Sequence, residues 1–183
     1  MDQIAFNDTR LVLKVKRSNL FVRILLYIIT FLSAALPIGG FVVNFVHGGT
    51  FEFSHLICLL LSGLIFFFIL RISLWNTCGK EVIIMLDNKL IYTADYNWFK
   101  DKVKEFTFNK IQYTLRQVGY EEDNKGVLVI NFDKKITLET VTKLDLVALT
   151  ALIAQLNKNC NSNLNYGNTY NSFYYFDDYT FRL

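Results

Sequence analysis

The stretch IFFFILRISLWNTCGKEVII, residues 65–84, decides how the chain is divided. Residues 65–70 are entirely apolar and suit the hydrocarbon core of a membrane. Arg71 ends that run, and from Lys80 onward the sequence takes on the two-residue alternation of a β-strand. This change predicts a membrane boundary between Arg71 and Trp75, followed by a domain in water.

Two charge-free apolar runs precede that boundary. The first, residues 24–43, has roughly the 20 residues that a helix needs to cross a bilayer, and the second, 55–70, reaches that length when extended by a few residues. Pro37 and the glycines that follow it predict a kink or an early end of the first helix. A signal peptide and a pair of buried core helices are the alternatives. The long strand-like stretch before the first run and the closeness of the two runs favour a two-span hairpin over residues 20–75.

The flanking charges predict the orientation of this hairpin. Residues 1–23 contain five basic and two acidic residues, whereas the linker NFVHGGTFEFS, residues 44–54, contains no Lys or Arg. The positive-inside rule therefore predicts that both termini are cytoplasmic and that the linker lies outside. The abundance of Asn, Lys, Ile, Phe and Tyr indicates an AT-rich bacterial genome. We expect a multi-pass protein of the bacterial inner (cytoplasmic) membrane.

Residues 76–160 are predicted to form a cytoplasmic domain. Segments with two-residue alternation between polar turns predict about five to seven short antiparallel strands, namely KEVIIML, LIYTADY, VKEFTF, KIQYTLRQVGY, VLVINF and ITLE. The spacing then becomes that of an amphipathic helix in TVTKLDLVALTALIAQLNKN, with Thr142 as the expected N-cap. The fold class is therefore an α+β membrane protein: a two-helix hairpin, then a small antiparallel sheet or partial barrel closed by a C-terminal helix.

The two ends of the chain have different characters. Residues 1–19 include TRLVLKVKRS, which predicts either a strand at the edge of the cytoplasmic sheet or a basic arm on anionic lipid. The tail, residues 161–183, is rich in Asn and Tyr and has no sustained period, which is typical of a flexible segment. Its aromatic residues are candidates for binding a partner, for pairing as a strand, or for lying back on the domain or membrane; they are Phe173, Tyr174, Tyr175, Phe176, Tyr179 and Phe181.

This order of elements resembles the membrane-anchored bacterial pleckstrin-homology-like (PH-like) proteins with two transmembrane helices. The resemblance covers residues 20–158 and rests on the helix pair, the stretch LWNTCGKEVIIMLDNKLIYTADYNWFKDKVKEFTFNKIQYTL, and the strands and helix after it. It implies a PH-like domain in a non-enzymatic, membrane-associated scaffold or binding module. Those bacterial domains often lack the basic phosphoinositide pocket of their eukaryotic relatives.

The residues that carry most enzyme chemistry are sparse. Both histidines, His47 and His55, flank the outer linker, so the cytoplasmic domain has no histidine to activate a nucleophile. The three cysteines have no paired spacing, which argues against a disulfide framework and a zinc site. We expect no catalytic residue, no cofactor and no metal. Residues 71–160 contain thirteen basic and eleven acidic residues, a mixture that does not favour nucleic-acid binding.

The segment WFKDKVK, residues 98–104, is the best candidate for lipid or partner contact. Trp98 and Phe99 suit a membrane interface, while Lys100, Lys102 and Lys104 alternate as if on one strand face and suit anionic headgroups. The alternative is a solvated strand face with both aromatic residues in the core.

These observations predict a membrane-tethered, non-catalytic protein-interaction module or scaffold. Its expected partners are membrane lipids and a protein of unknown identity, either a resident membrane protein or a toxin. An immunity protein that neutralises a membrane-acting or secreted antibacterial toxin is the first alternative. An anionic-lipid-sensing membrane protein is the second.

Overall fold

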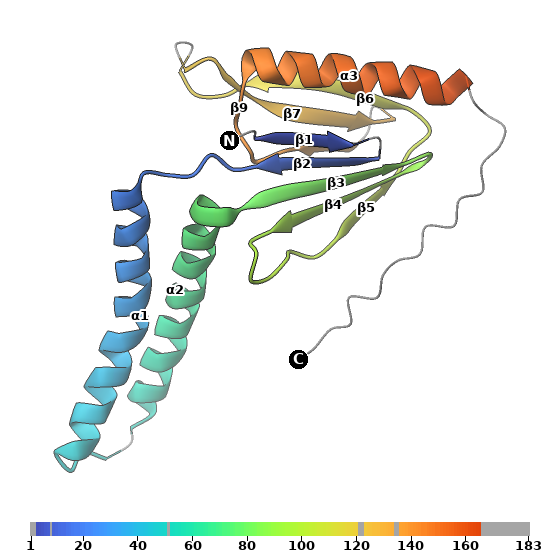
Figure 1. Ribbon diagram of the computed structural model, residues 1–183. Coiled ribbons are helices and arrows are strands. Elements are labelled where there is room, and N and C mark those ends of the chain that lie inside the picture. The colour runs from blue at the N-terminus through green and yellow to red at the C-terminus, as the bar shows by residue number, and fades with distance from the viewer. Residues whose placement is uncertain (1–2, 8, 51, 121–122, 134–135, 166–183) are drawn as a thin grey trace.

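The computed structural model describes residues 3–7, 9–50, 52–120, 123–133 and 136–165, with residues 160–165 described by their backbone alone. In chain order it contains a β-hairpin, two long helices, antiparallel sheets and a third helix (Figure 1). The α+β arrangement expected from the sequence, with two apolar helices followed by antiparallel sheets and a C-terminal helix, is confirmed.

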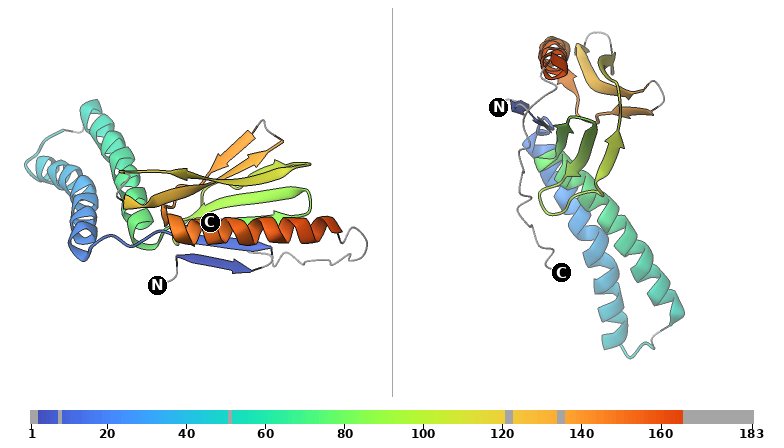
Figure 2. Two further views of the ribbon diagram at one scale, coloured as in Figure 1. Left: turned by 90° about the horizontal axis from the view of Figure 1, so that it is seen from above. Right: turned by 90° about the vertical axis from the view of Figure 1, so that its right-hand side faces the viewer.

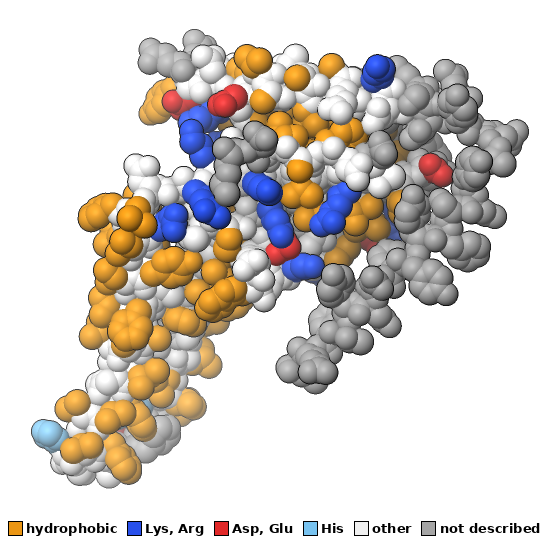
Figure 3. Space-filling model, in the orientation of Figure 1, with side chains coloured by type: hydrophobic (Ala, Val, Ile, Leu, Met, Phe, Trp, Pro, Cys, Tyr) orange, Lys and Arg blue, Asp and Glu red, His pale blue; other side chains and the backbone are white. Residues whose placement is uncertain are grey.

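The two long helices, α1 (Leu20–Val46) and α2 (Phe53–Cys78), pack side by side and extend away from the sheets (Figures 1 and 2). We call this pair the stalk. Both helices are long and apolar enough to cross a membrane, judged by length and composition. Most of their large apolar side chains are exposed (Figure 3). Of the two alternatives expected at Pro37, the early end of the first helix is wrong, because α1 continues past Pro37 to Val46.

The residues before α1 form a hairpin of β1 (Ile4–Asn7) and β2 (Arg10–Lys14). Strand β2 pairs with β3 (Lys80–Leu86), which follows α2 after Gly79 alone, and Lys14 lies opposite Lys80. The strand-like segment before the stalk is therefore an inner strand of the sheet, and β1, which the sequence analysis did not predict, lies beside it at the edge. The stalk and the sheet are thus joined through two neighbouring strands.

Two antiparallel sheets form the domain. The first has the order β1-β2-β3-β4-β5 and is completed by β4 (Lys89–Asp95) and β5 (Lys104–Thr107). The second has the order β6-β7-β8, and β9 also pairs with β7; its strands are β6 (Ile111–Gln117), β7 (Lys125–Phe132), β8 (Ile136–Glu139) and the two-residue β9 (Leu144–Asp145).

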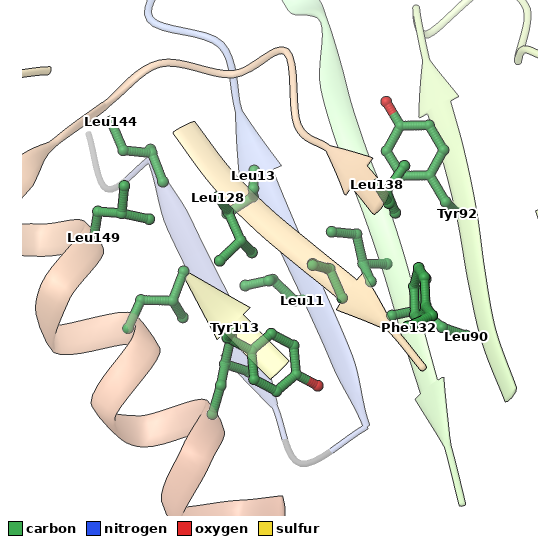
Figure 4. Close-up of a cluster of buried hydrophobic side chains, with 14 of the residues drawn as sticks. Leu11, Leu13, Leu90, Tyr92, Tyr113, Leu128, Phe132, Leu138, Leu144 and Leu149 are labelled. Carbon is green, nitrogen blue, oxygen red and sulfur yellow. The ribbon is translucent and has the colours of Figure 1, made fainter. Parts of the chain in front are cut away.

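Both sheets and helix α3 (Leu146–Asn165) contribute side chains to one apolar core (Figure 4). Alternate residues of each strand point inward because successive side chains of a strand face opposite sides. The helix adds leucines three and four residues apart, which fall on one face. The almost completely buried members of the core are Leu11, Leu13, Ile83, Leu90, Leu128, Ile130, Phe132, Leu144, Leu149 and Leu156.

The bounds of α3 differ from those that the sequence predicts. Thr142, the expected N-cap, lies in the connection before β9, and its backbone N–H donates to the Glu81 carboxylate at 2.8 Å. The helix begins only at Leu146 and continues to Asn165, beyond the expected start of the tail. The leucine spacing identified the body of the helix, whereas its start follows from the pairing of β9 with β7, because Leu144 and Asp145 are strand residues.

Candidate binding cleft between helix and sheet

Arg71, near the end of α2, is held by the connection between β4 and β5. Its Nη2 atom forms an ion pair with Asp101 Oδ2 at 2.5 Å, and its Nε–H donates to the Tyr96 hydroxyl oxygen at 2.9 Å. The guanidinium carbon also lies 5.0 Å from the centroid of the Tyr96 ring, within cation–π distance. Arg71 therefore fixes α2 to groups 25 and 30 residues further along the chain.

Aromatic rings reinforce the same junction. Phe99 stacks on Tyr96 with centroids 4.8 Å apart and on Phe67 of α2 with centroids 5.8 Å apart. Trp75, in the last turn of α2, lies 5.1 Å from the Tyr96 ring. Each such pair contributes about 0.5–1.5 kcal/mol beyond the burial of its surface. The β4–β5 connection is therefore packed against α2 over at least two helical turns.

A cleft of about 360 Å³ lies between α2 and this connection. Its volume is within the range of small-ligand sites, about 300–1,000 Å³. Helix α2 supplies the apolar side chains of Phe68 and Ile72 and the cation of Arg71. The sheet side supplies the charged residues Asp101, Lys102 and Lys104. The sheet side also supplies apolar and aromatic residues, including Tyr92 and Ala94, so the cleft is mainly apolar with charged residues from both sides.

The charge balance of the cleft is positive. Its lining has three basic side chains and one carboxylate, and that carboxylate, Asp101, is already paired with Arg71. Within the described part of the chain, Lys102 and Lys104 have no carboxylate at ion-pair distance. Lys and Arg side chains gather where the stalk meets the domain (Figure 3). An anion in the cleft would therefore meet two exposed ammonium groups, which form strong charge-assisted hydrogen bonds with phosphate oxygens.

Tyr92 also lines the cleft and is held by a buried carboxylate. Its hydroxyl donates to Glu81 Oε1 at 2.6 Å, and the same carboxylate accepts the backbone N–H groups of Val141 at 2.9 Å and Thr142 at 2.8 Å. Burial, together with the nearby Glu81 carboxylate, raises the pKa of the Tyr92 phenol well above its ordinary value. Tyr92 is therefore neutral across the physiological pH range, and Glu81 joins the first sheet to the β8–β9 connection.

The structure distributes the five predicted contact residues among different positions. Lys102 and Lys104 line the cleft, and Phe99 packs against α2. Trp98 is 74% exposed and is not part of the cleft lining, and Lys100 makes an isolated β-bridge to the end of β4. The expected strand face of alternating lysines is wrong, because β5 begins only at Lys104.

The six aromatic residues proposed for partner binding lie outside the described residues; they are Phe173, Tyr174, Tyr175, Phe176, Tyr179 and Phe181. Tyr96 and Asp101 were not predicted as site residues, and Arg71 was predicted only as a boundary residue. The one available signal was a lone arginine at the end of an apolar helix, which needs a polar partner nearby. No local pattern indicates which residues of a later loop supply that partner.

Aromatic and basic side chains make up most of the cleft lining. Among the described residues, no group of three His, Cys, Asp or Glu side chains is placed to hold a metal ion. Burial raises the pKa of the Tyr96 hydroxyl, while the hydrogen bond from Arg71 partly opposes that shift.

Comparisons with protein-family models, curated proteins and solved structures give no match to this chain.

Proposed function

We propose that the protein is a two-span membrane protein that holds a PH-like, non-catalytic domain at the cytoplasmic face of a bacterial inner membrane. Helices α1 and α2 cross the bilayer, the linker between them lies outside, and both termini lie in the cytoplasm. The domain serves as a membrane-tethered protein-interaction module or scaffold.

The observation that carries this proposal is that the sheet is built directly on the stalk. Strand β2 precedes α1, strand β3 follows α2, and the two strands pair with Lys14 opposite Lys80. Ser18 Oγ donates to Asn76 Oδ1 at 3.0 Å, which adds a contact between the β2–α1 connection and the last turn of α2. Helices anchored in hydrocarbon would therefore fix the orientation of the domain as well as its location. A surface that binds partners at a membrane needs a fixed location and a fixed orientation.

The dimensions of the stalk support membrane insertion. Its helices have 27 and 26 residues, so at about 1.5 Å per residue each is about 40 Å long, more than the roughly 30 Å of a hydrocarbon core. Exposed apolar surface on this scale is unfavourable in water. Two polar side chains that face each other within the stalk satisfy one another, since Thr30 and Ser73 share a buried hydrogen bond of 3.1 Å.

The charge distribution supports the cytoplasmic orientation. Basic residues flank the ends of both helices nearest the sheets, whereas the linker contains none. The PH-like assignment is supported by the two antiparallel sheets and by the C-terminal helix whose leucines enter their shared core.

Cysteine accessibility tests the topology. The three native cysteines are replaced by serine, and single cysteines are introduced at two exposed positions, Thr50→Cys in the linker and Tyr120→Cys between β6 and β7. In spheroplasts, a membrane-impermeant maleimide should label position 50, and it should label position 120 only after lysis. Labelling of position 120 in intact spheroplasts would overturn the orientation. Release of the chain from membranes by alkaline carbonate would overturn insertion itself.

A further inference from the structure

We propose that the cleft between α2 and the β4–β5 connection binds the headgroup of one anionic phospholipid, whose acyl chains lie along the exposed face of α2. This inference rests on the proposed insertion of the stalk in a membrane. It assigns a ligand class to the cleft, with Lys102 and Lys104 as the residues that bind the phosphate.

The position of the cleft along α2 matches the depth of a headgroup. About 20 residues of helix cross the hydrocarbon core, and counted from Phe53 that length ends at Ile72. The remaining residues, 73–78, extend about 9 Å further at 1.5 Å per residue, into the zone of phosphates and glycerol. Arg71, Ile72 and Trp75, which line the cleft, lie at this boundary.

The polarity of the surface matches that of a phospholipid. The charged end is formed by Lys102 and Lys104, which have no carboxylate partner in the described residues. The apolar end continues down the helix, where Leu64, Phe68 and Ile72 are all exposed and stand four residues apart on one face. Phe68 and Ile72 belong to both parts, because they also line the cleft. A free phosphate would use only the charged end of this surface.

The neighbouring loop is suited to the same interface. Trp98 is 74% exposed next to Phe99, whose ring stacks on Phe67 of α2. An exposed tryptophan is costly in water but favourable at the level of lipid headgroups, where its apolar ring and its N–H group are both accommodated. The loop is therefore suited to rest in the interface beside α2.

Lipid retention by the purified full chain tests this assignment. The chain is exchanged into mixed micelles of a neutral detergent with phosphatidylglycerol or phosphatidylcholine, and bound lipid is counted by native mass spectrometry. We expect one retained phosphatidylglycerol and no comparable retention of phosphatidylcholine. The Lys102→Gln, Lys104→Gln double variant should weaken phosphatidylglycerol retention by about 25-fold, because each lysine near an anionic surface contributes about a factor of five.

A matched control is the double variant Lys110→Gln, Lys143→Gln, which removes the same charge from two exposed positions outside the cleft lining. It should retain phosphatidylglycerol like the wild type. Equal retention by the cleft variant and the control would overturn the proposal, as would equal retention of the two lipids.

Two further arms separate the possible sources of the anion. Phe68→Ala should weaken lipid retention, since it removes part of the apolar wall. An excess of inorganic phosphate should fail to displace the lipid, and complete displacement would mean that the cleft binds phosphate without the acyl chains. Every variant is also checked in the membrane fraction. A chain found in membranes but without bound lipid refutes the lipid site alone, whereas a chain absent from membranes refutes the membrane anchor.

Discussion

Replacing Glu81 by alanine should destabilise the domain more than any other single change of a charged residue in the first sheet. Glu81 is completely buried and accepts three hydrogen bonds, from Tyr92 and from the backbone N–H groups of Val141 and Thr142. A buried donor left without a partner costs about 1–3 kcal/mol. The donors of Tyr92 and Thr142 are buried and that of Val141 is only partly buried, so the three costs are unequal. We expect them to sum to about 4 kcal/mol, out of a typical unfolding free energy of about 5–15 kcal/mol.

Glutamine at the same position should cost less. Glu81 Oε1 accepts from Tyr92 and Val141, whereas Oε2 accepts only from Thr142. A glutamine that keeps its oxygen at the Oε1 position places an NH₂ group against the Thr142 N–H and loses that one bond. The expected loss is about 2 kcal/mol, the cost of one unsatisfied buried donor with its repulsive neighbour.

Urea titration of the full chain in detergent micelles measures both losses. Its two tryptophans, Trp75 and Trp98, lie at or beside the junction of stalk and domain and report unfolding by fluorescence. The control is Glu105→Gln on β5, which removes an exposed carboxylate paired with Lys89 at 2.7 Å and should cost less than about 1 kcal/mol. If Glu81→Ala lowers the unfolding free energy by no more than this control does, the buried carboxylate does not join the first sheet to the β8–β9 connection.

Three further predictions concern the pH response, the junction and the tail. The unfolding free energy should fall as pH rises above about 10, because an unfolded tyrosine loses its proton there and native Tyr92 keeps it. In urea titrations between about pH 8 and about pH 11, Tyr92→Phe should reduce this fall. An unchanged fall would refute the role of Tyr92. Arg71→Leu and Asp101→Asn should show a coupling of about 0.5–1 kcal/mol in a double-mutant cycle, since the ion pair is partly exposed, and additive effects would contradict the contact. Removing residues 166–183 should abolish co-purification of a stoichiometric protein partner from native membranes, and an unchanged yield of partner would exclude the tail as its binding segment.

The fold was largely predictable because its signals are local. The charge-free runs before Arg71 identified both helices of the stalk, and the alternation in KEVIIML identified β3 with the bounds Lys80–Leu86. Strand β1, Ile4–Asn7, was missed because its four residues offer only two large apolar side chains, Ile4 and Phe6, as a signal. The start of α3 was misplaced because Thr142 is held by Glu81, 61 residues earlier in the chain, and because Leu144 and Asp145 pair with β7.

The cleft was only partly predictable because its parts are distant in sequence. The lysines at 102 and 104 were identified from their spacing with aromatic neighbours, but their placement beside α2 depends on Arg71 and Asp101, which are 30 residues apart. Glu81 did leave a signal. It falls in the same phase as Ile83 in the alternation of β3, so the strand pattern by itself places a carboxylate on the inward face. Which groups satisfy that carboxylate is decided by tertiary packing.

Depth-dependent quenching of Trp98 tests the central claim most directly. The Trp75→Phe variant leaves Trp98 as the only fluorophore of its kind, and the chain is reconstituted in bilayers whose lipids carry bromine at different depths along the acyl chain. If the stalk spans the membrane and holds the β4–β5 connection at its surface, the shallowest bromines will quench Trp98 most strongly, and aqueous iodide will quench it weakly. Strong quenching by iodide with none from any brominated lipid would contradict the proposed placement of the domain on the membrane.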